Sequence, residues 1–581
     1  MKKIYSVIAL SCLLPVAAAA QTMSDALTFG TSNYYGTART MGMGNAVTAV
    51  GGDIGTIGIN PAGGAVSSFS QFSFSGGFLT ASSQSSFAPS YSVGADPVYA
   101  GAFKDSRTRA MMPNIGVNIV FESMSDSFRS WNLGMIVNRS QTFTSILSAS
   151  GLEGKSSITG AFATSVGNMP GDVIGDYDGM WDRGYYWNPL SAYAGGLINY
   201  DATAQEFYGS AETKYIDPAT GKNAYEVRGT LRQNIGNTTI GSRNDFILNN
   251  GFNFNDRFFL GINLTIPMAT YNYSEFYSET AQDPSEFTVT PEYWKNGSYI
   301  VGAATNYKEG VYKYSYNAEL SGIGAKIGVI WLPTAGLRLG AAITTPTDYT
   351  INERWYVESQ SSFTNSNYDA QAISPDAQST YEFISPYSAN FGVAYTFGRY
   401  GMLSVDYELT DYSHMRFREY NNGYTYSYND PFYYVNRLNS LFCGVSHSLR
   451  VGAEVRVLPS FSLRAGFNLT TDPQRYYNDT DNNMVYASDY DMYFDDYEMG
   501  KYQLVKSSAK YIGDKTTSVS FGAGYTSRGP FFADLAFRFT EMPARYYQAY
   551  GDYLADLGSY SPIVKSDPKL FDAVLTLGWR F

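Results

Sequence analysis

The sequence predicts an all-β protein: a transmembrane barrel of fourteen antiparallel strands with an N-terminal plug, or hatch. Three features support this. Many segments carry apolar residues on one face and charged residues on the other, short connections alternate with long ones, and a glycine-rich segment precedes the first strand. The chain has 581 residues, of which 51 are tyrosine and 36 are phenylalanine, well above ordinary usage. Aromatic residues in this number suit the surface that a barrel presents to lipid.

The first element is a leader, MKKIYSVIALSCLLPVAAAA. Lys2 and Lys3 precede an apolar run, and small residues at Ala18–Ala20 come directly before Gln21, which is the order of a secretory signal peptide. We therefore expect residues 1–20 to be removed. A lipoprotein anchor at Cys12 is a weaker alternative, because the apolar run before it is too short. After the leader, no apolar run reaches the 18 or so residues of a membrane helix.

The glycine-rich segment GTARTMGMGNAVTAVGGDIGTIGINPAG follows, from Gly36 to Gly63. A dinucleotide-binding loop would need a strand before it and a helix after it, and no strand precedes this segment. A barrel of fourteen strands is wide enough to leak unless something fills it. Glycine lets main chain pack closely against itself and against a wall. Residues 21–68 are therefore predicted to be a lumenal hatch, and residues 69–581 the barrel.

The last strand shows the alternation most clearly. Ala573, Leu575, Leu577, Trp579 and Phe581 occupy alternate positions, interleaved with polar or small residues such as Asp572 and Arg580. Period two places the two sets on opposite faces, one suited to lipid and the other to a wet lumen. A C-terminal phenylalanine closing such a strand resembles the assembly signal of bacterial outer-membrane barrels, which implies that role for Trp579 and Phe581.

The same pattern recurs along the chain. It predicts strands near 69–78, 113–122, 130–139, 243–254, 257–266, 321–332, 336–345, 388–397, 401–411, 447–458, 460–469, 516–526, 531–540 and 571–581. The connections after the even strands are short turns, whereas those after the odd strands are long loops, the longest at about 141–243. This asymmetry is typical of an outer-membrane barrel with short periplasmic turns and long extracellular loops. We therefore expect the cell outer membrane of a Gram-negative bacterium.

The glycine-rich segment also resembles the hatch of the FadL/TodX family of outer-membrane transporters for long-chain fatty acids and aromatic hydrocarbons. The matching residues are Gly42, Gly44, Ala46, Asp53, Asn60, Pro61 and Ala62. The hairpins GIGAKIGVIWLPTAGLRLGAAITTP and LRVGAEVRVLPSFSLRAGF, and the strand LSVDYELTDYS, resemble the family too. The resemblance implies uptake of hydrophobic compounds by passive diffusion, with a hatch movement that lets the ligand pass sideways or downward.

Inward-facing residues are the candidate ligand contacts. They are Arg450, Arg464 and Arg538, which could pair with a carboxylate, and the apolar Ile330 and Phe532. The alternative is that the arginines form salt bridges with acidic wall residues such as Glu454 and Asp534. Only two histidines occur, and neither lies in a recognisable catalytic or metal-binding pattern. We therefore expect no enzyme activity, no cofactor and no metal.

The partner classes follow from charge and composition. A net charge of −12 disfavours nucleic acid. Tyrosine-rich stretches at 418–435 and 476–498 have the composition of protein interfaces. A second function therefore stays open beside hydrophobic uptake: a structural outer-membrane subunit whose extracellular loops dock surface lipoproteins or another barrel, for example in the barrel-assembly machinery.

Overall fold

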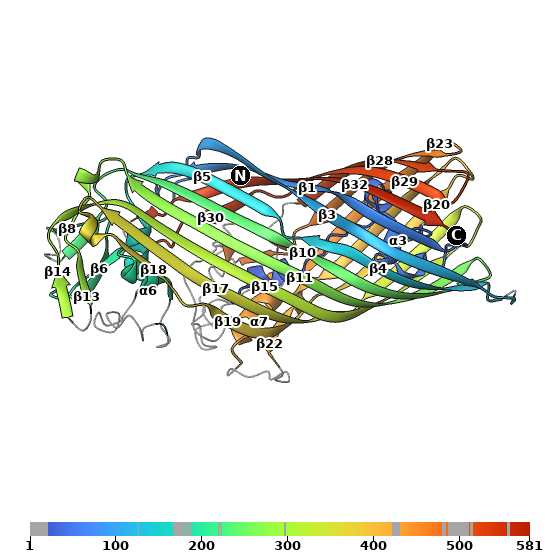
Figure 1. Ribbon diagram of the computed structural model, residues 1–581, viewed down its shortest axis with the longest axis horizontal. Coiled ribbons are helices and arrows are strands. Elements are labelled where there is room, and N and C mark those ends of the chain that lie inside the picture. Colours follow the sequence, from blue (N-terminus) through green and yellow to red (C-terminus); the bar gives the residue numbers. More distant parts are fainter. Residues whose placement is uncertain are drawn as a thin grey trace.

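The computed structural model describes residues 21–581 except 126, 167–180, 182–186, 219–220, 222, 296–297, 421–429, 479–483, 486–509, 512–514 and 555–557. The predicted signal peptide, most of the 476–498 stretch and the middle of the 418–435 stretch lie outside these residues. Among the helices in the described part of the chain, none is both long and apolar enough to cross a membrane. Long tilted strands surround a lumen, with the C-terminus at one end (Figure 1).

Fourteen antiparallel wall positions form the barrel. In order they are β1 (Gln71–Ala88), β3 (Ala100–Glu122), β4 (Ser130–Thr142) with β5 (Ser145–Glu153), β10 (Leu231–Phe254), β11 (Phe258–Ala281), β15 (Thr305–Trp331), β16 (Leu337–Thr344) with β17 (Asp348–Phe363), β19 (Ala377–Ile384) with β20 (Tyr387–Thr396), β21 (Gly401–Asp411), β23 (Val445–Leu458), β24 (Phe461–Thr471), β28 (Lys515–Thr526), β29 (Phe531–Glu541) with β30 (Arg545–Gln548), and β32 (Ile563–Arg580). β32 pairs with β1 along its whole length and closes the ring. The predicted fold class is confirmed.

The two ends of the barrel differ as predicted. At the end that holds the C-terminus, consecutive strands are joined by tight turns, such as Asn255–Asp256, where both residues adopt positive φ angles of 55° and 54°. At the other end the connections are long and carry their own helices and strands (Figure 1). The first end is therefore periplasmic and the second extracellular.

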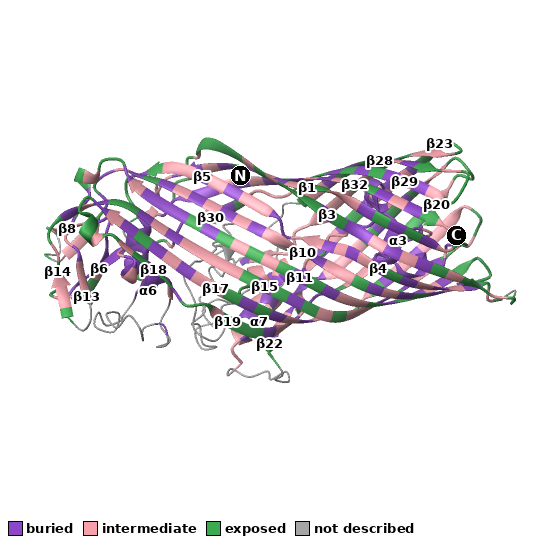
Figure 2. Ribbon diagram, in the orientation of Figure 1, coloured by how far each residue is buried: buried purple, intermediate pink, exposed green. Residues whose placement is uncertain are grey.

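The outer face near the periplasmic end is apolar. Along each strand, exposed and buried residues alternate (Figure 2), and the exposed positions include Ile327, Trp331, Phe391, Val405 and Phe521. A continuous exposed apolar belt on a closed barrel is stable only when lipid surrounds it, and closure satisfies the main-chain hydrogen bonds. The chain is an outer-membrane barrel.

Several strands are much longer than predicted. The expected strand at 321–332 is the end of β15, whose 27 residues would extend about 90 Å. Segments 79–112 and 268–319, expected to be loops, in fact contain the upper parts of β1, β3, β11 and β15. The wall therefore continues beyond the membrane on the extracellular side.

The extracellular end is closed by shorter elements. They are β2 (Tyr91–Ser92), α4 (Ile158–Ser165), α6 (Trp187–Ala194), β6 (Ile198–Asp201), β7 (Glu206–Gly209), β8 (Thr213–Ile216), β9 (Asn223–Glu226), η3 (Pro284–Glu286), β12 (Thr288–Val289), β13 (Glu292–Lys295), β14 (Ser298–Val301), η4 (Ser366–Tyr368), β18 (Ala370–Ile373), η5 (Tyr412–His414), β22 (Arg416–Glu419), α7 (Tyr433–Phe442), β25 (Arg475–Asn478), β26 (Met484–Val485), β27 (Lys510–Tyr511) and β31 (Ser559–Tyr560). Side chains of these elements, such as Leu190 and Ile198, pack with wall residues such as Tyr277 into an apolar core. The upper barrel is thus a filled cap.

Candidate functional site

Residues 22–68, which we call the hatch segment, lie inside the barrel at the level of the apolar belt. The segment folds as α1 (Met23–Gly30), α2 (Ala38–Gly42), α3 (Ile54–Ile57) and η1 (Pro61–Gly63). Each short helix starts at a residue whose side chain accepts a hydrogen bond from the helix backbone: Thr22, Thr37, Asp53 and Asn60 respectively. At Thr37, Asp53 and Asn60, which are buried, these caps satisfy amide groups away from water.

Asp53 and Asn60 each do more than cap a helix. The carboxylate of Asp53 also accepts a hydrogen bond from the Thr37 hydroxyl at 2.7 Å, which joins α2 to α3. The Asn60 amide donates to the Thr48 carbonyl at 2.7 Å within the hatch segment and to the Val329 carbonyl of β15 at 3.1 Å. The Asn-Pro-Ala cluster therefore ties the hatch segment to itself and to the wall.

A band of wall glycines, which we call the glycine girdle, faces the hatch segment. A Cβ atom at any of them would lie within 3.3 Å of a hatch atom: Gly251, Gly261, Gly328, Gly340, Gly392, Gly452, Gly466 and Gly522. Gly261 faces Pro61 and Ala62, Gly466 faces Gly44, and Gly522 faces Gly42. Main chain thus packs on main chain, and the predicted Gly42 and Gly44 supply the hatch half of that contact. Ala46 and Ala62 are fully buried in the same layer.

Charged wall residues also bind the hatch segment. Arg39 of α2 lies 2.9 Å from a Glu454 oxygen, and the same carboxylate binds Arg464 at 2.6 Å. Arg464 also forms an ion pair with Asp534 at 2.5 Å. One ion-pair chain therefore links α2 to three wall strands.

The candidate ligand contacts all point inward and are buried. Arg450 pairs with Glu408, Arg464 with Glu454 and Asp534, and Arg538 with Asp572 at 2.9 Å. The three arginines are therefore engaged in salt bridges with acidic wall residues, as in the alternative to ligand contact. Ile330 packs with Ala62 and Ala65 of the hatch segment, and Phe532 lies under the guanidinium of Arg580, 5.0 Å from the ring centre. Ligand contact by these five residues stays a prediction.

Sequence reasoning missed a second set of cations. Arg243, Lys326 and Arg338 donate to hatch carbonyls: Phe29 at 2.9 Å, Gly58 at 2.7 Å and Val50 at 2.6 Å, respectively. Each of the three lies at an inward position of its strand, which the alternation of residues in the sequence could have indicated. Their partners are carbonyl oxygens, however, which no residue pattern reveals.

The barrel wall has a gap beside the hatch segment. β3 pairs with β4 only from Asn114 opposite Asn138 down to Glu122 opposite Ser130. Above that level β4 and β5 pair with β10 on their other side, and no pairing of β3 with β5 occurs within the described strands. The edge of β4 exposed in this way is occupied by the hatch segment. The Asn33 amide donates to the Ser140 carbonyl at 2.7 Å, and the Tyr35 amide to the Arg139 carbonyl at 3.1 Å.

Two apolar clusters lie on either side of this contact. The first, the lateral cluster, joins the hatch residues Tyr35, Ala38 and Met41 to wall residues that include Met111 on β3. The second, the upper cluster, surrounds Ala26 and Phe29 of α1 with inward-facing wall side chains that include Phe143 and Phe383. The Phe29 ring makes an edge contact with Tyr271 at a centroid distance of 5.6 Å. Helix α1 therefore occupies an aromatic chamber above the gap.

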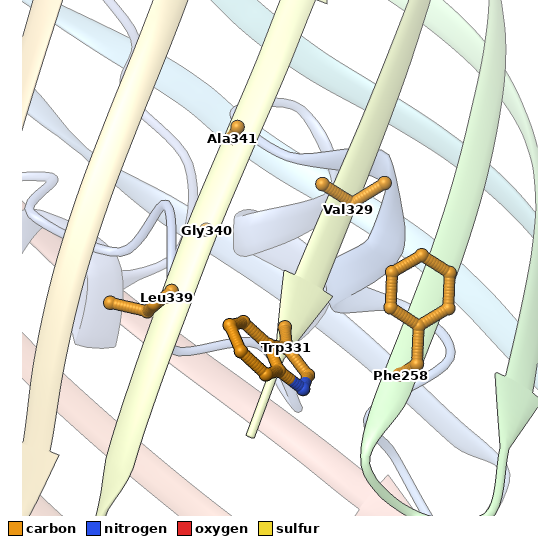
Figure 3. A pocket seen from close by; sticks show the side chains of 6 residues that line it. All are labelled: Phe258, Val329, Trp331, Leu339, Gly340 and Ala341. Atoms are coloured by element: carbon orange, nitrogen blue, oxygen red, sulfur yellow. The ribbon is translucent and has the colours of Figure 1, made fainter. Parts of the chain in front are cut away.

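A shallow depression of about 380 Å³ lies on the outer wall between β11, β15 and β16. Phe258, Trp331 and Leu339 rim it, and its floor is the main chain around Gly340 (Figure 3). Val329, Trp331 and Leu339 point outward from strands whose inner side contacts the hatch segment. This depression therefore faces lipid and is not part of the lumen.

Comparison with known proteins adds three structural likenesses. No family model and no curated protein matches the sequence. A FadL homologue of Pseudomonas aeruginosa aligns over 94% of this chain and 99% of its own, with 13% identity and a TM-score of 0.46. The toluene transporter TodX of Pseudomonas putida aligns over 93% and 97%, with 10% identity and a TM-score of 0.41. The toluene transporter TbuX of Ralstonia pickettii aligns over 94% and 98%, with 12% identity and a TM-score of 0.41.

These neighbours come from the family that the hatch sequence resembles, but likeness at this level carries no functional argument. The fold rests on the chain's own strand pairing, which closes fourteen positions into one ring. The chain is a fourteen-stranded outer-membrane β-barrel whose N-terminal segment lies in its lumen.

Proposed function

We propose that this barrel takes up hydrophobic compounds, long-chain fatty acids or molecules of similar apolarity, by passive diffusion past a movable hatch. One observation carries the proposal. The hatch segment is hydrogen-bonded to the strand edge that the wall gap leaves open, and apolar clusters lie on both sides of that contact. Movement of residues 33–35 away from β4 would connect the lumen with the gap.

The upper cluster suits an apolar ligand. Its wall side is lined by aromatic and aliphatic side chains, and the hatch residue Phe29 fills its centre. Burial of a phenylalanine side chain contributes about 1.5–3 kcal/mol. An acyl chain that takes the place of Phe29 would recover that contribution, so α1 and a ligand compete for one chamber.

Arg243 is our candidate for a carboxylate head group. Its guanidinium is buried and donates to the carbonyls of Phe29 and Thr31, each at 2.9 Å. When α1 leaves the chamber, these donors lose their partners, and a fatty-acid carboxylate would restore them in the bidentate geometry that arginine favours.

A disulfide across the gap tests the proposal. Residues that share a main-chain hydrogen bond lie within the Cα range that a disulfide bridges, so Asn33→Cys with Ser140→Cys should crosslink. The natural Cys443 is buried and does not compete. In proteoliposomes, we expect the oxidised pair to stop uptake of a fluorescent long-chain fatty acid and the reduced pair to restore it. A wall disulfide between Val393→Cys and Val405→Cys, lipid-facing neighbours on β20 and β21, is the control and should leave uptake unchanged.

Two results would contradict the proposal. Equal uptake by the oxidised and reduced hatch pair would show that the segment need not move. Absence of fatty-acid binding by the unlocked protein, together with stoichiometric recovery of a surface lipoprotein or a second barrel after gentle extraction, would favour the structural-subunit alternative.

A further inference from the structure

The gap beside β4 has a consequence higher up the wall. Above Met112, β3 pairs with β1 from Gly77 opposite Met111 to Phe87 opposite Ala100. Its other edge has no partner strand within the described residues. β5, which would continue the sheet there, packs through Leu147 and Ala149 against Phe87 of β1 and Val564 of β32. β5 therefore stays paired with β10, packs against β1 and β32 through its inward side chains, and leaves Ala100–Met112 as a free edge.

The side chains of β3 are exposed as expected for a strand with a free edge. From Ala100 to Ala110 every residue of β3 is exposed except Asp105 and Arg107, which are half-buried. On β1, by contrast, buried and less buried residues alternate. A wall strand normally exposes one face only, whereas this part of β3 exposes both. The tip of the hairpin of β1 and β3, in blue, lies on the upper border of the extracellular half of the barrel in Figure 1.

The free edge is long, and most of it lies above the apolar belt. Thirteen residues at about 3.4 Å each give an edge of about 44 Å. The apolar belt on β3 begins at the lower end of the edge, at Met112, and continues to Ile119 and Phe121. Unpaired amides and carbonyls over such a length are a template for another extended chain.

The charge on the edge selects the partner. Ala100–Met112 contains Lys104, Arg107 and Arg109 but a single acid, Asp105, in a chain whose net charge is −12. Opposite the three bases β1 carries the uncharged residues Gln84, Ala81 and Leu79. Asp105 accepts a hydrogen bond from Ser148 of β5 at 2.7 Å. The local charge is therefore positive and is not neutralised across the ladder.

A second copy of this chain is a poor occupant. Two β3 edges in antiparallel register would bring Lys104, Arg107 and Arg109 close to the same residues, and like charges across a ladder are destabilising. Basic side chains on an edge also disfavour neutral strands, because pairing would bury their charge. An acidic strand would form both the main-chain hydrogen bonds of the sheet and ion pairs with the three basic residues.

We propose that the free edge of β3 binds an extended acidic segment of another cell-surface protein, which adds as a strand beside Ala100–Met112. The interaction does not require movement of the hatch segment, because Lys104, Arg107 and Arg109 all stand above Met111, the residue of this edge that joins the lateral cluster with the hatch segment. Its main-chain hydrogen bonds supply affinity, and Lys104, Arg107 and Arg109 supply selectivity and register.

Site-specific photocrosslinking in intact cells tests the proposal. A photoreactive phenylalanine replaces Ala102, Ser106 or Ala110, which are exposed and four residues apart on one face. Strand addition predicts adducts on one acidic segment of a partner, with the crosslinked residue moving by four when the probe moves by four. Arg107→Glu with Arg109→Glu should reduce the adduct at least tenfold. Lys308→Glu, at an exposed basic position on β15, is the matched control and should not change it.

Folding of each variant is checked by the mobility shift that a closed barrel shows on heating in detergent. Adducts that do not move in step with the probe, that map to a second copy of this chain, or that fail to form at all three positions overturn the proposal. Hydrogen exchange on the purified protein gives an independent result. Slow exchange of every amide from Ala100 to Met112 would show that the edge is already covered and would also overturn it.

Discussion

Replacement of Gly466 by alanine should displace the hatch segment from the barrel wall. A Cβ atom at this position would lie 2.0 Å from the Gly44 nitrogen and 2.4 Å from the Met43 carbonyl carbon, whereas ordinary contacts begin at 3.4 Å. Both atoms are main chain, so no side-chain rotation relieves the overlap. Residues 43–44 would have to retreat by about 1.4 Å, the difference between 2.0 and 3.4 Å.

Overlap of this kind in a packed interior costs about 1–3 kcal/mol. If the whole cost acts on the seated state of the hatch segment, the displaced state becomes about 5-fold to about 150-fold more populated. Gly340→Ala should act alike on the other side of the lumen, because a Cβ there lies 2.3 Å from the Thr48 carbonyl oxygen. Gly236→Ala is the matched control, since its nearest neighbour is 3.8 Å away.

Ion conductance of the purified full chain in planar bilayers reports the displaced state. We expect frequent openings from Gly466→Ala and Gly340→Ala, and rare openings from Gly236→Ala and the parent protein. Variants are compared only after each shows the heat-dependent mobility shift of a closed barrel. If Gly466→Ala and Gly340→Ala conduct no more than Gly236→Ala, the contact between hatch segment and girdle is not what closes the lumen.

Three further changes test other contacts. Burial raises the pKa of Glu212 to about 7 from 4.5, so its loop should be most stable below pH 4.5 and lose about 3 kcal/mol of stability as pH rises through 7. Hydrogen exchange at Gly209, whose amide donates to this carboxyl group, should report the loss of stability. Glu212→Gln should abolish the pH dependence, and the control Glu206→Gln should retain it. Glu454→Gln should raise bilayer conductance more than Arg39→Met, because it strips both arginines of a carboxylate whereas Arg39→Met leaves the pair with Arg464; the reverse order would be inconsistent with the ion-pair chain. Deletion of Phe581, whose side chain is 69% exposed, should lower the assembled fraction in cells and leave the melting of assembled protein unchanged; equal assembly would remove its assigned role.

β15 shows why the membrane part of the wall was predictable and the upper part was not. Near the periplasm its outward residues are apolar, at Ile327, Val329 and Trp331, and its inward residues include Lys326 and Gly328. From Leu320 back to Tyr312 the strand keeps the same alternation, but its outward positions become polar, as at Glu319 and Asn317. Inward positions become apolar, as at Leu320 and Tyr312. The surroundings of the strand change from lipid to water at this level. A search for strands with apolar outward residues therefore finds only the membrane part of β15 and misses its extracellular part.

The hatch segment shows a different limit. Its position before the first strand and its small residues predicted a compact lumenal segment, and the caps at Asp53 and Asn60 use residue types that the sequence displays. The girdle could have been recognised from glycines that recur at inward positions of successive strands, such as Gly452 and Gly466, which pair directly across the ladder. The wall gap could not, because it arises from missing pairing between β3 and β5, which no single residue encodes.

One set of contacts between wall and hatch is asymmetric: buried wall cations donate to main-chain carbonyls of the hatch segment. Arg243, Lys326, Arg338 and Arg538 all donate to hatch carbonyls, the last at 3.3 Å from that of Tyr34. A hatch held by its carbonyls can change sequence freely as long as its residues stay small, which accounts for its glycine and alanine content. Movement of the segment would remove these carbonyl acceptors. Arg538 would keep its ion pair with Asp572, and Arg243 would keep Asp245 at 3.9 Å, but loss of a hydrogen-bond acceptor is costly for a buried cation. An apolar ligand that carries a carboxylate offsets that cost, whereas a neutral hydrocarbon does not. If the hatch opens as proposed, the cations that hold it closed would favour opening by an anionic amphiphile over opening by a neutral hydrocarbon.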